Sequence, residues 1–432
     1  MHIEVPQIDL RAALSAGPID LGKSLSLFAW VGIAIGVVVF FTCLFTEYPN
    51  ELLWGSYFVN LLFWMGIAVG SVMTAVIFQI VRALWAVPIR RVGEANIAFL
   101  PWAYVLLLCT YFGKEHLYPW ATSPMPGREW WMQPNFVYAR FAIIFLLFFY
   151  LLYRFVKCSV RSDVGIVREY GADKSFWTGT IYKSLVSGWR GEDEEVLAAQ
   201  QTMSFMAPIV VVCYAVTWTL FATEMINSMD TIWFSNMFGG FEFLQNIYTG
   251  WAMIAVLSIY IAGKHVEFGN HLRSRQLWDL GMLMFGFCML YGYTFFSQFL
   301  PQWYGNMPEE TQWLILRTRE EPWKTVGYIT LVCAFIIPFV TLLSRDLKRN
   351  PKTLTIVCCI IFIGVWLTKY MLIMPQVSPN HVPLSFVDIS LFLGFCGLYV
   401  LSVSSFLKSF PFMTVSHPQA RGDVKSLSLI HI

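Results

Sequence analysis

The stretch WGSYFVNLLFWMGIAVGSVMTAVIFQI, residues 54–80, contains no charged side chain. A membrane helix needs about 20 mainly apolar residues, so this stretch predicts a helix that crosses a bilayer. The rest of the chain has the same character, because 57% of its 432 residues are hydrophobic and 13% are charged. Soluble domains carry about 25% charged residues, so the composition excludes a soluble enzyme. The net charge of +2 is too small for a nucleic-acid-binding surface.

Apolar runs of this length recur along the chain. They predict an all-α polytopic membrane protein with ten transmembrane helices. The expected spans are 24–46, 53–84, 95–112, 136–158, 198–225, 241–263, 277–300, 325–344, 354–374 and 385–407. The first span is not followed by a small-residue cleavage site, so we expect it to be retained and not removed as a signal peptide.

Lysine and arginine are distributed unequally between the two sides of these spans. One set of segments holds 22 of the 29 basic residues, and two more lie within spans. The other five are Lys114, Arg128, Arg317, Arg319 and Lys324. Because basic segments stay on the cytoplasmic side, we expect the N-terminal segment 1–23 and the C-terminal tail 408–432 to be cytoplasmic.

The loops expected on the opposite side are rich in tryptophan. These loops are 113–135, 226–240 and 301–324. Two interpretations are open. The tryptophans anchor the protein at the headgroup level of the bilayer, or they form a face that docks an extrinsic subunit.

Two spans repeat one pattern. Residues 64–71 read WMGIAVGS and residues 251–258 read WAMIAVLS, so Trp, Ile, Ala, Val and Ser coincide at an offset of 187. Both copies start on the same side, and the repeat is therefore parallel. It predicts two four-helix bundles flanked by one helix each. The predicted units are 24–46, 53–225, 241–374 and 385–407. Gly66 and Gly70 form a G-x-x-x-G pair, whose expected role is close helix packing.

Ligands for metals and haem are missing from the sequence patterns. None of the nine cysteines belongs to a C-x-x-C motif, so no iron–sulfur or zinc ligand set is evident. None of the seven histidines falls in the middle of a span, so we expect no b-type haem. No P-loop or dinucleotide fingerprint occurs. We therefore expect no redox cofactor held by the chain itself and no catalytic residue of a stand-alone enzyme.

Ionisable residues at membrane depth are costly, and for this reason they are functional candidates. The candidates in the outer half, for a proton relay or a quinone headgroup site, are Arg140, Glu224, Glu242, Lys369 and Asp388, with His381 just outside the membrane. The candidates for proton entry in the inner half are Glu94, Glu267 and Asp279. The alternative is that each of these side chains pairs structurally or extends its charged end to the interface.

Two stretches carry a family resemblance. WGSYFVNLLFWMGIAVGS at residues 54–71 and PIRRVGEANIAFLPW at residues 88–102 resemble the NrfD-like family of polysulfide reductase membrane subunits. Within it they are most similar to the second (ActF-like) membrane subunit of bacterial alternative complex III. The resemblance covers all ten spans, and its motifs are membrane-helix patterns and not catalytic signatures.

The resemblance implies an inner-membrane subunit of a respiratory quinol:cytochrome c oxidoreductase. It implies quinone-linked electron transfer, with quinone or menaquinone as the candidate ligand and proton translocation as a candidate activity. The implied partners are a paralogous NrfD-like membrane subunit, an extracytoplasmic iron–sulfur subunit and c-type cytochromes. Because no histidine of this chain matches the one used by the paralogue's quinol site, a proton-conducting or scaffolding role fits best. The competing hypotheses are a secondary transporter and a purely structural anchor.

Overall fold

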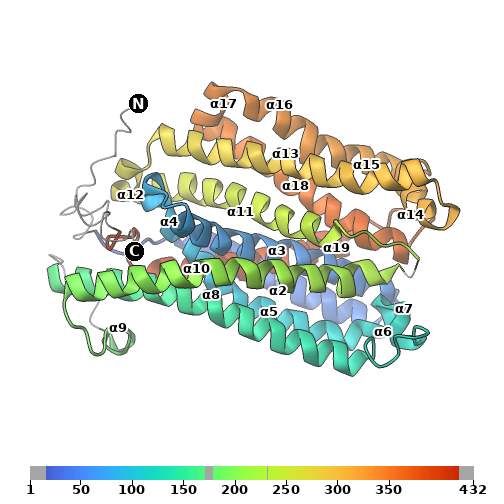
Figure 1. Cartoon of the computed structure of the whole chain (residues 1–432), viewed down its shortest axis with the longest axis horizontal. Helices are drawn as coiled ribbons and strands as arrows, with labels where there is room; N and C mark the ends of the chain where they lie inside the picture. The colour runs from blue at the N-terminus through green and yellow to red at the C-terminus, as the bar shows by residue number, and fades with distance from the viewer. Residues whose placement is uncertain (1–15, 171–178, 231, 418–432) are drawn as a thin grey trace.

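The computed structural model describes residues 16–170, 179–230 and 232–417, which are helical without any strand. Ten helical stretches in this part of the chain are long and apolar enough to cross a membrane (Figure 1). They are Lys23–Phe45, Asn50–Ile80, Leu84–Leu117, Pro134–Tyr170, Glu192–Met229, Phe238–Ala262, Ser274–Gly305, Trp323–Leu343, Pro351–Val377 and Phe386–Ser409. The expectation of an all-α polytopic membrane protein with ten transmembrane helices is confirmed.

Seven of these stretches are single helices, and three are composite. The single helices are α2 (Lys23–Phe45), α3 (Asn50–Ile80), α8 (Pro134–Tyr170), α11 (Phe238–Ala262), α13 (Ser274–Gly305), α18 (Pro351–Val377) and α19 (Phe386–Ser409). The composite stretches contain α4 (Val87–Glu94), α5 (Leu100–Cys109) and α6 (Lys114–Leu117); α10 (Glu192–Phe221) and the π turn η5 (Ala222–Ile226); and α15 (Trp323–Leu331), the π turn η7 (Val332–Ile336) and α16 (Ile337–Leu343). Short helices outside the spans are α7 (Pro119–Thr122), α9 (Thr180–Leu185), α12 (Val266–His271), α14 (Pro308–Thr318) and α17 (Arg345–Arg349).

The third span differs from its expected bounds of 95–112. It begins at Leu84 and is divided into short helices, with Pro88 and Pro101 in the first turns of α4 and α5. Proline lacks the backbone N–H that a helix interior requires, and it fits the first turn of a new helix. Four segments lie outside the described residues. They are 1–15 in the expected N-terminal segment, 171–178 and 231 in loops between spans, and 418–432 in the expected tail.

Helix packing arranges the spans as two four-helix groups. In the first bundle α3, α5, α8 and α10 pack on one another, and in the second bundle α11, α13, α15–α16 and α18 do so. Helices α2 and α19 pack against each other. A Cβ at Gly36 would lie 2.7 Å from the Cα of Gly394, so this pair approaches closely because both residues lack a side chain.

The two bundles meet along α3 and α11. Helix α3 is apolar on all sides and is buried along nearly its whole length, as expected for a helix surrounded by protein. A Cβ at Gly70 would lie 1.7 Å from the backbone oxygen of Asn246, and one at Gly250 would lie 2.4 Å from the carbonyl carbon of Gly70. The G-x-x-x-G pair is therefore a packing contact between the two bundles.

The molecule has two distinct ends (Figure 1). One end carries α4, α9 and α12 and is bordered by most of the basic residues, and we call it the basic end. The opposite end carries α6, α7 and α14 together with the tryptophan-containing loops, and we call it the tryptophan-rich end. Each candidate site below belongs to one of these ends.

Candidate functional site

A buried ion pair joins two helices of the second bundle. Lys369 of α18 lies with its Nζ 2.6 Å from Oε2 of Glu242 on α11, and both side chains are 1% exposed. Gln245, one turn along α11, donates from Nε2 to the other carboxylate oxygen at 3.3 Å. Removing two charges from water costs several kcal/mol per ion unless they pair. The pair therefore satisfies both residues that the sequence singles out as costly.

A second ion pair lies in the first bundle at the tryptophan-rich end. Arg140 of α8 pairs with Glu224, which lies on the π turn η5 at the end of α10. Trp131 donates from Nε1 to Glu224 Oε1 at 2.9 Å, and its ring lies 4.0 Å from the Arg140 guanidinium carbon. Cation–π stacking of this kind stabilises a partly desolvated guanidinium.

The remaining outer candidates have local structural contacts. Asp388 closes a capping box at the start of α19, where its Oδ2 accepts from the backbone N–H of Ser385 at 2.8 Å. His381 is exposed in the loop before α19, with Nδ1 3.2 Å from Ser378 Oγ. The five outer residues expected to form one polar cluster therefore divide into two ion pairs, in different bundles, and a helix cap.

At the basic end, Glu94 is the centre of a buried network. It accepts hydrogen bonds from Arg90 Nε at 3.0 Å and Ser159 Oγ at 3.1 Å, and it pairs with Arg91. Arg91 also pairs with Asp163 of α8. We call Arg90, Arg91, Glu94, Ser159 and Asp163 the inner network. All five side chains are buried.

The other two inner candidates lie elsewhere. Glu267 is half-buried on α12, where its backbone carbonyl lies 2.7 Å from Nδ1 of His271. Asp279 is half-buried on α13. Sequence reasoning therefore identified one member of the inner network, and it did not identify Asp163, which lies beyond the expected end of its span.

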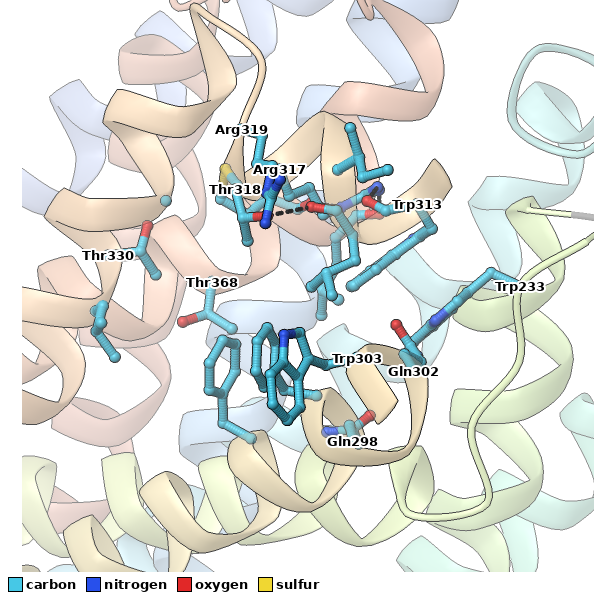
Figure 2. Close-up of a pocket in the computed structure, with 18 of the residues that line it drawn as sticks. Trp233, Gln298, Gln302, Trp303, Trp313, Arg317, Thr318, Arg319, Thr330 and Thr368 are labelled. Carbon is cyan, nitrogen blue, oxygen red and sulfur yellow. Dashed lines mark hydrogen bonds between the residues drawn. The ribbon is translucent and has the colours of Figure 1, made fainter. Parts of the chain in front are cut away.

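An aromatic cavity of about 510 Å³ opens at the tryptophan-rich end of the second bundle. Figure 2 shows it between Trp303 and Gln298 of α13 on one side and Arg317 of α14 on the other. Nine of its lining residues are aromatic: Trp233, Phe238, Phe241, Tyr291, Phe295, Phe299, Trp303, Trp313 and Tyr328. Ligand sites typically have about 300–1,000 Å³ and combine apolar walls with a few polar groups.

Two polar groups in the cavity wall have no partner among the described residues. Gln302 is 6% exposed, and its Oε1 accepts no hydrogen bond. Trp233 is 4% exposed, and its Nε1 donates none. Its ring stacks on Trp313 with centroids 3.9 Å apart and planes 5° from parallel. Because buried polar groups are nearly always hydrogen-bonded, this acceptor and this donor stand out among the residues of the wall.

Arg317 holds the part of the cavity wall that α14 forms. Its guanidinium donates to the carbonyl oxygen of Met371 at 2.8 Å and lies 3.9 Å over the ring of Trp313. Burial lowers the pKa of Arg317 to about 9, opposed by the nearby carboxylate of Asp230. Arg317 therefore remains a cation at neutral pH, and it ties α14 to the end of α18.

The cavity and the Glu242–Lys369 pair share one wall. Phe241 and Thr368, which precede the two charged residues in sequence, both line the cavity. Tyr291 lines it as well, with its hydroxyl 2.9 Å from Oγ1 of Thr368. The ion pair therefore lies on the same stretches of α11 and α18 as this wall.

Sequence reasoning missed the residues of this cavity. Arg317 was counted as one of the loop charges used for orientation, and Trp233 as one of the loop tryptophans. A signal was present in the spacing of Trp313 and Arg317, which are four residues apart and so share one face of α14. Three tryptophans of the loops, Trp120, Trp233 and Trp323, are buried, so these loops contribute to the core as well as to the surface.

Fold and site together define a polytopic membrane protein that places a buried ion pair beside an aromatic cavity at one membrane face. The sequence pattern of the polysulphide reductase NrfD family matches residues 44–378, a range that contains both bundles. The chain belongs to this NrfD family, whose members are membrane subunits of quinone-linked redox complexes and partner with iron–sulfur subunits. Among curated proteins none matches the chain.

Proposed function

We propose that the chain is the second (ActF-like) NrfD-type membrane subunit of an alternative complex III, a respiratory quinol:cytochrome c oxidoreductase. In this proposal the aromatic cavity takes the headgroup of a quinone or menaquinone. The observation that carries it is the pair of unpartnered groups, Gln302 Oε1 and Trp233 Nε1, in an aromatic cavity. Membership of a family of quinone-linked subunits supports the same assignment.

The chemistry of the cavity suits a quinone in several respects. A flat ring can stack on aromatic side chains, a quinol hydroxyl can donate to Gln302, and a quinone carbonyl can accept from Trp233. Trp303 and Tyr328, at the rim, are 60% and 57% exposed. Because this surface faces lipid in a membrane-spanning protein, an isoprenoid tail can leave the cavity into the bilayer.

The Glu242–Lys369 ion pair supports a role in proton movement. Oxidation of a quinol releases two protons with its two electrons, and the electrons would pass to the iron–sulfur partner. Glu242 follows Phe241 of the cavity wall in sequence, and Lys369 balances its charge. A positioned carboxylate can take up and release a proton. A guanidinium is a poor proton carrier, which suits Arg140 to a structural role.

The proposal includes an orientation. The excess of basic residues supports a cytoplasmic basic end in a bacterial inner membrane. The tryptophan-rich end, with the cavity, would then face the iron–sulfur and c-type cytochrome subunits outside. Exposed Trp130 is a side chain suited to such an interface.

The test uses the assembled complex. Gln302→Leu keeps the size of the side chain and removes the acceptor, so the KM for quinol should rise about tenfold, the equivalent of roughly 1.4 kcal/mol. Gln298→Leu is the matched control, because Gln298 lines the same cavity while its Nε2 donates to the Thr294 carbonyl at 3.1 Å. Bound quinone, extracted and quantified, should fall in the first variant alone. Wild-type KM and wild-type quinone content in both Gln302→Leu and Trp233→Phe would exclude the cavity as the site.

A further inference from the structure

The chain after α19 has an unusual environment. Helix α19 ends at Ser409, and the following irregular segment is buried at every residue from 411 to 417. Irregular segments normally run over the surface, because their backbone polar groups need partners. We call residues 410–417 the C-terminal strap. It lies at the basic end, against α4 and α12 (Figure 1).

The strap is bonded directly to the inner network. The backbone N–H of Ser416 donates to Oδ1 of Asp163 at 2.6 Å, and Oδ2 of the same carboxylate pairs with Arg91. The hydroxyl of Thr414 donates to the carbonyl oxygen of Val87, at the start of α4, at 3.1 Å. Asp163 and Arg91 have no exposed surface. The strap therefore covers the network and completes the hydrogen bonding of one of its acids.

The last described residue of the strap carries no charge into this site. His417 is buried, and its burial together with the positive charge of Arg90 lowers its pKa to about 3. At neutral pH the imidazole is neutral. The two arginines of the network are then balanced by Glu94 and Asp163 without a contribution from the strap.

Other parts of the chain hold the strap from its far side. The ring of Phe412 lies 4.9 Å from that of His265 and 6.3 Å from that of Phe268 on α12. Where the strap begins, the Tyr182 hydroxyl donates to the Ser409 carbonyl at 2.7 Å. The strap is thus enclosed between the first bundle and the short helices α9 and α12.

We propose that the C-terminal strap is a closure over the basic end of the first bundle, and that its release admits water and protons to Asp163 and Glu94. The contacts make such a release feasible. Water can replace the single N–H that the strap gives to Asp163, whereas the arginine–carboxylate pairs are internal to the bundle and stay when the strap leaves. This proposal does not depend on where quinone binds.

The experiment compares amide hydrogen exchange in the purified complex for two matched pairs of variants. Truncation after Ser409 removes the strap, and truncation after His417 keeps it. Ser416→Pro removes the N–H that bonds Asp163, and Ser416→Ala keeps it. We expect peptides within 87–94 and 159–167 to exchange about tenfold faster in the first member of each pair, since local opening sets exchange rates, and at the wild-type rate in the second.

Two outcomes would overturn the closure. Exchange within 87–94 and 159–167 that changes less than twofold in both the truncation after Ser409 and Ser416→Pro would show that the strap shields nothing. Faster exchange throughout the first bundle, including the centre of α3, would show that the segment is needed for folding and is not a separable closure. The proline variant decides the matter if the shorter chain fails to assemble.

Discussion

The sequence predicts the two bundles as a repeat, and they differ in how they use the corresponding space. At the offset of 187, Leu108 and Tyr111 of the first bundle correspond to Phe295 and Gln298 of the second. Both pairs line cavities, an open apolar groove between α5 and α8 in the first and the aromatic cavity in the second. In the groove the polar groups bond to each other, as in the 2.8 Å hydrogen bond from the Tyr111 hydroxyl to Asn135.

The aromatic cavity differs from the groove because two of its polar groups lack partners. Gln302 Oε1 and Trp233 Nε1 are buried without hydrogen bonds among the described residues. The polar groups are thus satisfied in the groove of the first bundle and partly unsatisfied in the cavity of the second. Each bundle has an ion pair toward the tryptophan-rich end, and the first bundle also holds the inner network.

The largest expected effect concerns the seam that holds the two bundles together. Gly70→Ala places a Cβ 1.7 Å from the backbone oxygen of Asn246, and backbone on both sides must move. We expect loss of assembled protein, measured as the yield of monodisperse complex after purification. Overpacking alone destabilises a protein by about 1–3 kcal/mol. The loss should be larger here, because α3 and α11 must move apart.

Gly66→Ala is the matched control for the seam. Its Cβ would meet the side-chain oxygen of Asn246 at 2.3 Å, and a side chain can rotate away. We expect this variant to assemble with a lowered thermal midpoint. Equal yields of the two variants would show that the bundles do not depend on close contact along α3.

A second comparison uses the ion pairs. Lys369→Met leaves Glu242 buried without its cation, and breaking a buried pair costs about 3–5 kcal/mol. Arg140→Met acts on a pair whose side chains are 12% and 11% exposed, so water compensates more and the cost should be smaller. Thermal unfolding of both variants measures the difference. Recovery of stability in the double variant Glu242→Gln with Lys369→Met would confirm that the unpaired charge causes the loss.

The sequence alone predicted the spans well and the site only in part. Ten apolar runs are a direct consequence of bilayer thickness, so the spans needed no tertiary information. Glu242 and Lys369 stood out because charge at membrane depth is costly, but their pairing across 127 residues depends on the rotation of α11 against α18. Each residue turns a helix by about 100°, and the pattern of an all-apolar helix does not fix that rotation.

The cavity and the strap could not be predicted for a different reason. The cavity is the space left between α11, α13, α14, α15 and α18, and no single segment encodes it. Arg317 lies between two predicted spans and residues 411–417 follow the last one, yet both are buried. Burial of a loop follows from what packs over it, and sequence patterning reports only the periodicity of regular elements.

A third prediction separates the two bundles by activity. The Glu242→Gln complex should assemble. It should lower quinol:cytochrome c turnover about tenfold or uncouple turnover from proton release. A general acid or base that acts directly contributes about 10²–10⁴-fold, and the effect here should be smaller because other groups can partly replace one member of a proton relay. Glu224→Gln, in the bundle without the aromatic cavity, should keep near wild-type turnover. Stopped-flow reduction of cytochrome c with a pH dye measures both quantities. Wild-type turnover and proton release in both variants would assign a structural role to the pairs.

The last expected effect is a pH dependence confined to the first bundle. The pKa of His417 is lowered to about 3 in the folded protein by burial and by Arg90, against about 6.5 for a free histidine. Between these values the released strap binds a proton that the packed strap does not. The strap's stability is therefore complete above pH 6.5 and falls as the pH decreases toward 3, by at most about 1.4 kcal/mol per pH unit. The charged groups around it, Arg90, Arg91, Glu94 and Asp163, are paired.

Hydrogen exchange within 410–417, corrected for its intrinsic pH dependence, should accelerate between pH 7 and pH 5 in the wild type. His417→Gln, which cannot protonate, should show a flat corrected profile. An equal acceleration in both proteins would show that His417 does not cause the pH dependence. The carboxylates of the inner network would then be its source, and the strap would distinguish the first bundle from the second by its packing alone.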